Sequence, residues 1–527
     1  MSDITPSNYW LDIAVREILT TYPEGTITVS SGISPSASYH IGHFREIMTA
    51  DALTWGIKAA GRDARHVHVV DNFDPLRRRY SFLPESFEAY VGWPISLVPD
   101  PFDDCKNEHG TYAEHFYREF EGYAKQMGIV PDEVVRSYED LYANGRMAPI
   151  IETAVAKAAK VRAIFAEVSN RTLPEDWLPL QLLSEEKSFN AYRYDSIDTE
   201  NHVINALDAD GQRHELDYTA GQVKLNWRVD WPGRWRVLGV QVEPFSAQEH
   251  GAAGGSYETG ERISREVFGQ EPPIPGVRYA NIHMLSDTKK MSSSKGNLIT
   301  PAQALAIMPP EVLRYFVVRS RADRTLVWDS GQGLFNLLKE FGTTREIMEA
   351  GGAAEFADAY RFAIATGDSA TISSIPFEHL VQVYQTAGRD VAQSLTILRR
   401  TGYDEQVSAQ EETIMREFTF VSGWLERYAP ENVRFELQAT LPEVELSPEQ
   451  KMFLTTLAKN TEGLEPLNGD LMHTAIYDAV TQAGIKPGEG FKTLYRLILA
   501  RDSGPRAGWF LASLNFDWLR ARLRREH

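Results

Sequence analysis

The chain has 527 residues, 43% of them hydrophobic and 24% charged, and its formal net charge is −19. This length suggests about three or four domains, and no apolar run approaches the ~20 residues that a membrane helix needs. The N-terminus lacks the pattern of a secretory signal. Cys105 is the only cysteine, which excludes an internal disulfide or a zinc site built on several thiolates. We therefore expect a cytoplasmic protein.

The first ~75 residues alternate strand and helix patterns, as in a nucleotide-binding α/β sheet. Residues 26–31 and 65–70 predict buried strands, and residues 41–60 predict a helix between them. Ligands of open parallel sheets bind beyond the carboxyl ends of the strands. The turn at 32–43 and the turn at 71–74 both follow such ends, so they are candidate site segments.

From about residue 93 to residue 226 this alternation is lost, which indicates an insertion. Helices are expected near 113–127 and 150–167, and a hairpin turn at 208–211. Sheet character returns at 235–242, followed by a helix at 257–268 and a strand at 278–284. The sequence thus predicts a parallel sheet in two halves.

After about residue 300 the pattern is helical to the end of the chain. The expected helices cover residues 311–319, 333–350, 377–400, 410–427, 448–461, 470–483 and 490–501. We therefore predict an α/β fold: a Rossmann-type parallel-sheet domain, an inserted α+β region and an all-α C-terminal domain.

The segment from Pro35 to His43 reads as a strand entering a helix through a histidine-glycine-histidine turn. Free N–H groups and the helix dipole at such a turn favour anions. Gly42 permits a close backbone approach, and His40 and His43 can donate to phosphate oxygens. Two surface histidines at a helix start are the structural alternative.

Lys289, Lys290 and Lys295 lie with Ser292–Ser294 on a short hydroxyl-rich segment after the last predicted strand. Ammonium groups there can close over a pyrophosphate as charge develops, and the serines add donors. A solvated loop is the more frequent explanation of such a cluster alone, but its place after the last strand favours the phosphate interpretation.

Together the two segments resemble the HIGH and KMSKS signatures of class I aminoacyl-tRNA synthetases, which activate an amino acid with ATP. The usual second lysine of the second signature falls on Ser293, so Lys290 and Lys295 are the expected charge donors. The resemblance implies His40, His43, Lys290 and Lys295 as catalytic residues. It implies an ATP site of Pro35, Ser36, His40, Gly42, His43, Lys290, Ser292, Ser293, Ser294 and Lys295.

Most of the first ~340 residues look like class I lysyl-tRNA synthetase, the type of archaea and some bacteria. The resemblance is carried by residues 31–36, 44–46, 65–71, 94–101, 112–116, 223–232 and 254–260. The segment from Trp227 to Trp235 is the most diagnostic, because other synthetases with the same signatures have no reason to carry it.

This resemblance implies a lysine pocket of Gly32, Ser34, Asp71, Asn72, Asp230, Trp231, Glu249, His250 and Tyr279. A lysine substrate needs an apolar wall for its stem and a carboxylate or aromatic face for its ammonium. Trp227 and Trp235 are expected to pack a domain junction. The acid that meets the ammonium stays open.

The resemblance also implies a division into a catalytic domain (1–92 and 227–300), a connective insertion (93–226), a helical junction (301–350) and an anticodon-binding domain (351–527). Expected partners are lysine, ATP with Mg²⁺ and tRNA(Lys), with no membrane and a monomeric state. No structural zinc is expected, because the insertion lacks cysteines. The net charge gives tRNA binding no support, and the arginine clusters at 399–400 and 520–525 fit solvated helix ends as well as phosphate contacts.

Three alternatives remain at this point. A synthetase for glutamate or another amino acid would need a cation in the pocket. A small cytidylyl- or adenylyltransferase would leave the long helical half unexplained. A tRNA-binding paralogue without catalysis is disfavoured by intact His40, Gly42, His43, Lys290 and Lys295.

Overall fold

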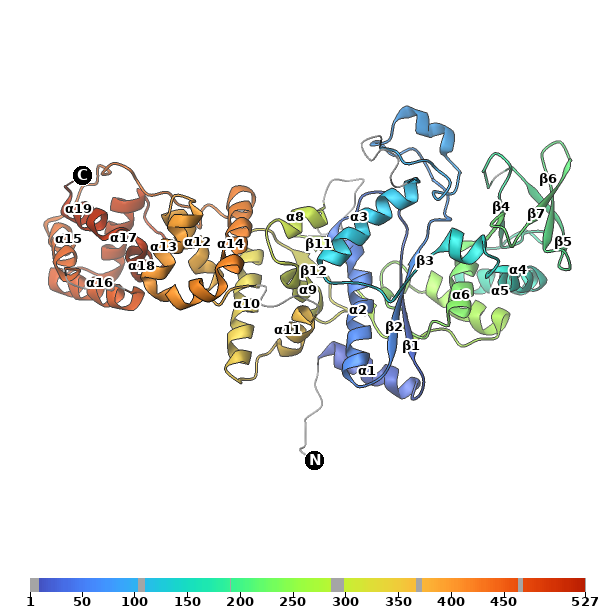
Figure 1. The fold of residues 1–527 in the computed structure, drawn as a ribbon, viewed down its shortest axis with the longest axis horizontal. Coiled ribbons are helices and arrows are strands. Elements are labelled where there is room, and N and C mark those ends of the chain that lie inside the picture. Colours follow the sequence, from blue (N-terminus) through green and yellow to red (C-terminus); the bar gives the residue numbers. More distant parts are fainter. Residues whose placement is uncertain are drawn as a thin grey trace. The chain divides into compact units, whose positions relative to one another are not determined.

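The computed structural model describes residues 9–102, 110–189, 191–285, 298–365, 372–462 and 468–526. The chain forms two compact units, shown as ribbons in Figure 1. Unit 1 comprises Met1–Pro301 with Val317–Val327, and unit 2 comprises Ala302–Phe316 with Trp328–His527. The finer division into domains stays a prediction.

Unit 1 is built on a parallel sheet in which β1 (Ile27–Ile33), β2 (Ala64–Val70) and β3 (Glu133–Arg136) lie in that order. On the other side of β1, Val29 pairs in parallel with Val242, which pairs in parallel with Ile274. The first predicted strands are therefore confirmed, and β1 lies inside the sheet. Its residues from Ile27 to Ser31 are buried, as parallel sheets covered on both faces require.

The helix predicted at 41–60 is confirmed: the short 3₁₀ turn η1 (Ile41–His43) leads directly into α2 (Phe44–Ala59). α2 is buried along most of its length, with Ile47, Leu53 and Ile57 each at most 2% exposed. It packs between the sheet and α1 (Trp10–Thr21). A Cβ at Gly56 would lie 2.8 Å from the Val15 side chain, so this contact is close.

The region predicted as an insertion, residues 93–226, contains α3 (Tyr112–Gln126), the sheet strand β3 and the π-helical turn η4 (Ser137–Tyr142), followed by two further helices and two antiparallel sheets. The single helix predicted at 150–167 is two helices, α4 (Ala148–Ala156) and α5 (Ala158–Ser169), because Lys157 leaves helical geometry at φ −108° and ψ 24°. The small sheets are β4 (Leu180–Leu182) with β8 (Val223–Leu225), and β5 (Arg193–Asp198), β6 (Val203–Leu207) and β7 (Arg213–Asp217).

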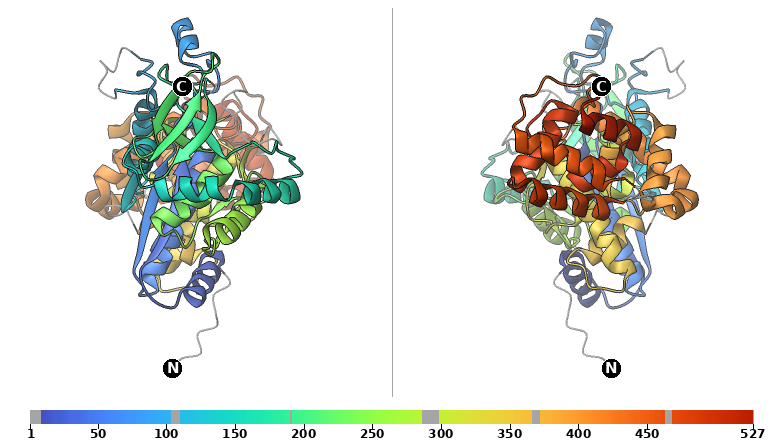
Figure 2. Two further views of the ribbon diagram at one scale, coloured as in Figure 1. Left: turned by 90° about the vertical axis from the view of Figure 1, so that its right-hand side faces the viewer. Right: turned by 90° about the vertical axis from the view of Figure 1, so that its left-hand side faces the viewer.

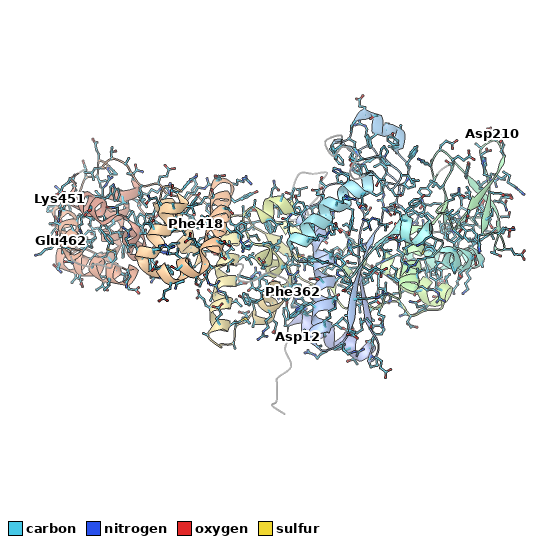
Figure 3. All side chains as sticks on the ribbon, in the orientation of Figure 1. Asp12, Asp210, Phe362, Phe418, Lys451 and Glu462 are labelled. Carbon is cyan, nitrogen blue, oxygen red and sulfur yellow. The ribbon has the colours of Figure 1, made fainter. Side chains whose placement is uncertain are left out.

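The hairpin predicted at 208–211 joins β6 and β7. Its turn is closed by the Asp208 carboxylate, which accepts backbone N–H bonds from Asp210 and Gln212 at 2.9 Å each. Figure 3 labels Asp210 at this tip, and the left panel of Figure 2 shows the twisted three-stranded sheet face-on.

The prediction of a strand at 235–242 is wrong. Residues 227–238 form the helix α6 (Trp227–Leu238), which begins where the Asn226 side chain accepts the Arg228 N–H and ends at left-handed Gly239. Trp227, Trp231 and Trp235 recur every four residues, which is the helical period and not the alternation of a strand. Extended backbone begins only near Val240.

The remaining strands of this region form two separate two-stranded sheets. β9 (Phe245–Ser246) pairs in parallel with β10 (Arg278–Tyr279), and β11 (Ile282–Met284) pairs with β12 (Leu326–Trp328). α7 (Ser256–Ile263) and the π-helical turn η5 (Ser264–Phe268) lie at the predicted helix, and the short 3₁₀ helix η2 (Glu85–Tyr90) lies between β2 and α3.

Within its described residues unit 2 is helical, as predicted, and its last helices pack around a continuous apolar core (Figure 2, right). The helix predicted at 377–400 is broken, because Gly388 and Arg389 both take left-handed backbone angles. From residue 301 onward, the helices among the described residues are α8 (Pro301–Leu305), α9 (Pro310–Val318), α10 (Gln332–Glu349), α11 (Ala357–Ile364), α12 (Phe377–Thr386), α13 (Val391–Leu398), η6 (Arg399–Tyr403), α14 (Asp404–Arg427), α15 (Pro448–Asn460), α16 (Gly469–Ala483), α17 (Pro487–Leu499), α18 (Ala507–Ser513) and α19 (Phe516–Arg524).

Candidate active site

The backbone fixes both predicted histidines in the turn between β1 and α2. His40 Nδ1 accepts the Gly42 N–H at 3.1 Å, and His43 Nδ1 accepts the His40 N–H at 3.1 Å. A neutral imidazole that accepts at Nδ1 carries its proton on Nε2, so each ring presents an N–H donor. The two ring centroids lie 3.9 Å apart, at a helix start where the dipole favours an anion.

Gly42 is needed for close packing. A Cβ at this position would lie 2.8 Å from both Nδ1 and Cε1 of His40, closer than real Cβ atoms approach a neighbour. Any side chain at position 42 therefore displaces the His40 imidazole and breaks the hydrogen bond that sets its tautomer.

The second signature, with Lys289, Lys290, Ser292, Ser293, Ser294 and Lys295, lies outside the described residues, so its role stays a prediction. Both flanks of that segment reach the histidine turn or its pocket. Ile282 in β11 lines the pocket, and the Ile299 carbonyl accepts the Ile41 N–H at 3.1 Å. The chain thus leaves from and returns to the place where phosphates would bind.

A pocket of about 550 Å³ opens at the end of β1. Its lining includes most of the predicted lysine-binding residues, namely Gly32, Ser34, Asp71, Trp231, Glu249, His250 and Tyr279, together with His40, Gly42 and His43 of the predicted ATP site. Segments more than 200 positions apart therefore build one site.

Four of the predicted site residues do not line this pocket. Asn72 and Asp230 lie behind its wall, where the Asn72 amide donates to Glu139 at 2.6 Å and Asp230 accepts the Tyr142 hydroxyl at 2.5 Å. Pro35 and Ser36 precede the histidine turn, and the Ser36 carbonyl is occupied by the Tyr112 hydroxyl at 2.6 Å. These groups already have partners within the fold.

Aromatic rings from α6 and the following segment form an apolar wall. Trp231 stacks on Trp227 with ring centroids 5.2 Å apart and contacts Trp235 at 4.9 Å and His250 at 5.4 Å. Trp227 and Trp235 pack against the surrounding core and also line the pocket, and their expected place at a domain junction stays a prediction. The alkyl stem of a long side chain fits such a wall.

Glu46 and Glu243 place two carboxylates in the pocket. Glu46 accepts the Gly32 N–H at 2.8 Å and the Tyr279 hydroxyl at 2.7 Å. Glu243 accepts the Trp231 indole N–H at 3.1 Å and also the Trp235 indole N–H. Within the described part of the chain neither carboxylate forms a salt bridge.

Burial disfavours the ionised form of both acids. Burial raises the pKa of Glu46 to about 7, although the Tyr279 and Gly32 donors lower it. Burial likewise raises the pKa of Glu243 against its two indole donors. Buried charge without a counterion is costly, so both carboxylates would be stabilised by positively charged ligand groups.

A second group of charges, in the pocket and directly behind its wall, forms ion pairs within the protein. Arg234 pairs with Asp71 at 2.9 Å and also with Asp230, and Lys224 pairs with Asp74 at 3.0 Å. Burial alone would raise the pKa of Asp71, but Arg234 and Lys224 hold it below its ordinary value. Asp71 is therefore a charged residue whose cation the protein supplies.

Sequence analysis missed Glu46, Glu243 and Arg234 as pocket residues. Glu243 could have been recognised, because an acid between Val242 and Pro244 stands out in a mostly apolar segment. The Asp230–Arg234 ion pair could also have been recognised from its i, i+4 spacing, but only if residues 227–238 are taken as a helix. Nothing in the sequence marks Glu46, because its orientation depends on packing around α2.

Across the described residues no group of three or more His, Cys, Asp or Glu side chains could hold a metal ion. In the same part of the chain, no helix has the length and apolarity to cross a membrane. The absence of zinc expected from the sequence stays a prediction.

A parallel sheet interrupted by an insertion, with a histidine-glycine-histidine turn at the end of its first strand, defines the catalytic domain of a class I aminoacyl-tRNA synthetase. The chain matches a family model described as tRNA synthetases class I (K) over residues 8–365.

Full-length relatives agree with this match. The chain is 37% identical over 518 residues to a lysine–tRNA ligase of Archaeoglobus fulgidus, covering 98% of this chain and 99% of that protein. It is 38% identical over 539 residues to lysine–tRNA ligase 1 of Methanosarcina acetivorans, with 98% of each chain covered. The chain belongs to the family of class I (K) tRNA synthetases.

Proposed function

We propose that this protein is a lysine–tRNA ligase. The lysine carboxylate attacks the α-phosphate of ATP, the bond to the β-phosphate breaks, and pyrophosphate leaves lysyl-adenylate behind. A hydroxyl of the 3′-terminal adenosine of tRNA(Lys), first the 2′-hydroxyl, then attacks the lysyl carbonyl and releases AMP. The family and the names of the full-length relatives support this reaction.

The observation that carries the choice of lysine is a pair of carboxylates, that of half-buried Glu46 and that of buried Glu243. Lysine brings two ammonium groups, and Glu46 and Glu243 are two acids with raised pKa values and no salt bridge among the described residues. The tryptophan wall fits the four-carbon stem between those ammonium groups. We infer that one acid meets the α-ammonium and the other meets the ε-ammonium.

A glutamate substrate fits this pocket less well. Its side-chain carboxylate would need a cation. The lining contains two arginines: Arg234 is already shared by Asp71 and Asp230, and Arg77 lies 3.6 Å from the Asp74 carboxylate. Two further acids, Glu46 and Glu243, would repel it. The charge in the pocket therefore favours a dicationic amino acid.

The histidine turn would bind the triphosphate. His40 and His43 supply neutral N–H donors, and the start of α2 supplies a favourable dipole. Such donors stabilise charge that grows on the phosphates as pyrophosphate leaves. The predicted charge donors Lys290 and Lys295 belong to the segment whose flanks, Ile282 and Ile299, adjoin this site. Class I synthetases use ATP as its Mg²⁺ complex, and phosphates would hold most of that ion.

Unit 2 is proposed to bind the anticodon of tRNA(Lys). It contains a pocket of about 550 Å³ lined by Tyr403, Trp509 and His379, among others. Their rings are close: His379 lies 5.0 Å from Tyr403 and 5.5 Å from Trp509, centroid to centroid. Aromatic side chains of this kind bind unstacked RNA bases.

The arginine clusters are weaker candidates for RNA contacts. Arg400 donates to the carbonyls of Ser513 and Leu514 at 2.8 and 2.9 Å. Arg522 is 2% exposed and donates to the Gln438 carbonyl at 2.6 Å. Both therefore hold helices of unit 2 together.

The test is ATP–pyrophosphate exchange on purified protein with each amino acid in turn. Lysine is expected to support exchange, and ornithine and arginine to support far less. Exchange with glutamate or another amino acid but not with lysine would contradict the substrate. Lys290→Ala tests the non-catalytic alternative, because unaltered aminoacylation in this variant would remove the second signature from the mechanism. We place the protein in the cytoplasm as a monomer.

A further inference from the structure

Residues 34–40, which lead from β1 into the histidine turn, form neither helix nor strand. Inside this segment the Ser36 N–H donates to the Ser34 carbonyl at 2.9 Å. An irregular segment lacks the regular backbone ladder of a helix or a sheet, so contacts with neighbouring elements must fix its course. The positions of His40 and His43 therefore depend on what holds residues 34–40.

The helix α3 makes polar contacts with two residues of this segment. The Tyr112 hydroxyl donates to the Ser36 carbonyl at 2.6 Å, and the Ser38 hydroxyl donates to the Glu119 carboxylate. Tyr112 is fully buried, and Glu119 is half-buried. A carbonyl beside a buried donor is costly to leave without it, so the first of these contacts is the stronger constraint.

An aromatic contact from the same helix reaches the histidine turn itself. The Tyr39 ring lies 5.0 Å from the Phe120 ring and meets the His43 imidazole edge-on at 5.4 Å, centroid to centroid. Phe120 also stacks on Phe44, the first residue of α2, at 4.4 Å. Phe120 thus packs against the chain on both sides of the turn. In a densely packed interior, rings in such contact move little relative to one another.

The spacing of these contacts matches the geometry of the two elements. Positions 112 and 119 are seven residues apart, so they lie on one face of α3, ~10 Å apart along its axis. Three residues of extended chain, as from Ser36 to Tyr39, also span about 10 Å. The segment can therefore follow the helix for two turns and meet it at each end.

α3, drawn in cyan in Figure 1, is itself anchored to the sheet. Arg136, the last residue of β3, donates to Glu114 at 2.8 and 3.0 Å, and its guanidinium lies 5.3 Å from the Tyr117 ring centroid. The Tyr112 N–H donates to the Val98 carbonyl at 2.9 Å. Part of the region predicted as a connective insertion thus supports the turn that precedes α2.

We propose that α3 is the positioning element of the histidine turn and that Tyr112 and Glu119 are positioning residues for lysine activation, an assignment that rests on the proposed function. Neither side chain lines the pocket, so both act through residues 36–38 and not on a substrate. Their contacts keep His40 and His43 where the imidazole N–H donors meet the phosphates as adenylate forms.

The experiment measures lysine-dependent pyrophosphate exchange in Tyr112→Phe, which removes one hydroxyl and keeps the ring. Because the Ser36 carbonyl loses its donor, kcat is expected to fall roughly tenfold, while the KM for lysine stays within twofold. Glu119→Ala is expected to lower kcat about threefold. Glu119→Gln should restore it, because the amide oxygen of glutamine still accepts the Ser38 hydroxyl.

Two matched controls remove similar groups elsewhere in unit 1. Tyr22→Phe deletes a hydroxyl that donates to the Gln241 carbonyl at 3.1 Å. Glu121→Ala deletes an acid of α3 that pairs with Lys125 at 2.9 Å. Both variants are expected to keep kcat within twofold of the unaltered protein, and Tm is recorded for every variant.

A double variant with Gly42→Ala separates positioning from general support of the fold. A Cβ at Gly42 displaces the His40 imidazole, so the turn is already disturbed in that background. If Tyr112 acts through the turn, Tyr112→Phe is expected to lower kcat less than twofold there. Effects that multiply in the double variant would assign Tyr112 to the fold in general and overturn the proposal.

The remaining outcomes keep this proposal and the proposed function apart. An unaltered protein that neither supports lysine-dependent exchange nor charges tRNA(Lys) overturns the proposed function. With exchange intact, an unchanged kcat in Tyr112→Phe and Glu119→Ala overturns the positioning role of α3. A raised KM for lysine at constant kcat also overturns it, because the contacts would then serve the lysine pocket and not the histidine turn.

Discussion

The two units contain pockets of the same size, about 550 Å³ each, with opposite chemistry. In unit 1 the lining includes the half-buried acid Glu46, the buried acid Glu243 and the ion-paired Arg234. In unit 2 the buried side chains of the lining are neutral or aromatic, and burial lowers the pKa of His379 to about 4, so that it is uncharged near neutrality. Size therefore does not distinguish their ligands, but charge does.

The two pockets also differ in the partners of their polar groups. In unit 1 the carboxylates of Glu46 and Glu243 have hydrogen-bond donors but no salt bridge among the described residues. In unit 2, His379 Nε2 and Gln382 Nε2 are buried without a hydrogen-bond partner. An amino acid with two ammonium groups would add a cation beside each of these carboxylates. An RNA base would offer hydrogen-bond partners to the two buried nitrogen atoms.

Removing one negative charge from the first pocket tests this contrast most strongly. Glu46→Gln and Glu243→Gln keep side-chain size and are each expected to lower kcat/KM for lysine in pyrophosphate exchange by about 10²–10³-fold. That is the loss expected when one member of a desolvated charge pair is neutralised. The KM for tRNA is expected to change little.

The matched control is Glu17→Gln on the exposed face of α1, which removes the same charge far from the pocket and is expected to leave exchange unchanged. Wild-type exchange rates in Glu46→Gln and Glu243→Gln would show that neither carboxylate meets an ammonium group. The charge contrast between the pockets would then have no functional meaning.

Gly42→Ala tests whether the charged pocket also depends on the geometry of its histidine turn. The added Cβ would meet the His40 imidazole at 2.8 Å, so we expect exchange to fall by roughly 10²-fold, the lower end of the range for losing one positioned donor to a growing charge. Gly122→Ala, in the middle of α3 with no atom within 4 Å of the new Cβ, is the control. Equal activity in both variants would contradict the role of His40.

The first half of the sheet and most helices could be predicted from the sequence, because their signals are local. Residues 26–31 and 65–70 are apolar strands, and the histidine turn lies at a recognisable helix start. The strand expected at 235–242 failed because Val237, Leu238, Val240 and Val242 are compatible with a strand in a short window. Only the longer tryptophan period reveals α6.

Site residues were predictable where the resemblance named them, and were missed where only packing selects them. Glu46 is one of several acids on exposed and buried helices, and nothing local distinguishes it. It becomes a pocket residue because α2 lies against β1, which brings its carboxylate to the Gly32 N–H at 2.8 Å. Such contacts between separate elements are absent from the sequence pattern.

Trp509→Ala probes the aromatic pocket of unit 2. We expect the KM for tRNA(Lys) to rise roughly 10–30-fold through loss of base stacking, with lysine-dependent exchange unaltered. Trp509→Phe should restore most of the affinity if stacking is responsible, whereas a purely structural role would require the indole volume that packs against Gly469. Tyr477→Ala, an exposed aromatic of the same unit, is expected to have no effect.

The pH dependence of lysine binding is expected to show the smallest effect, and it would distinguish the pockets without mutation. With a pKa of about 7, Glu46 is mostly protonated at pH 6 and mostly ionised at pH 8. Because an ammonium group binds the carboxylate, the KM for lysine in exchange should fall about tenfold between these values. The KM for tRNA should change less, because Glu417, the unit 2 carboxyl whose pKa burial also raises to about 7, does not line the aromatic pocket.

The raised pKa of Glu46 also determines how the stability of the protein depends on pH. The folded pKa of Glu46 lies above its ordinary value of 4.5, so its stabilising contribution is full below about pH 4.5 and is lost as the pH rises through about 7. Bound lysine supplies the missing cation and lowers this pKa, and so it should raise Tm more at pH 8 than at pH 6. Glu46→Gln is expected to abolish this difference. A lysine-induced Tm shift that is independent of pH in the unaltered protein would assign the ammonium groups to acids that are already ionised, such as Asp71.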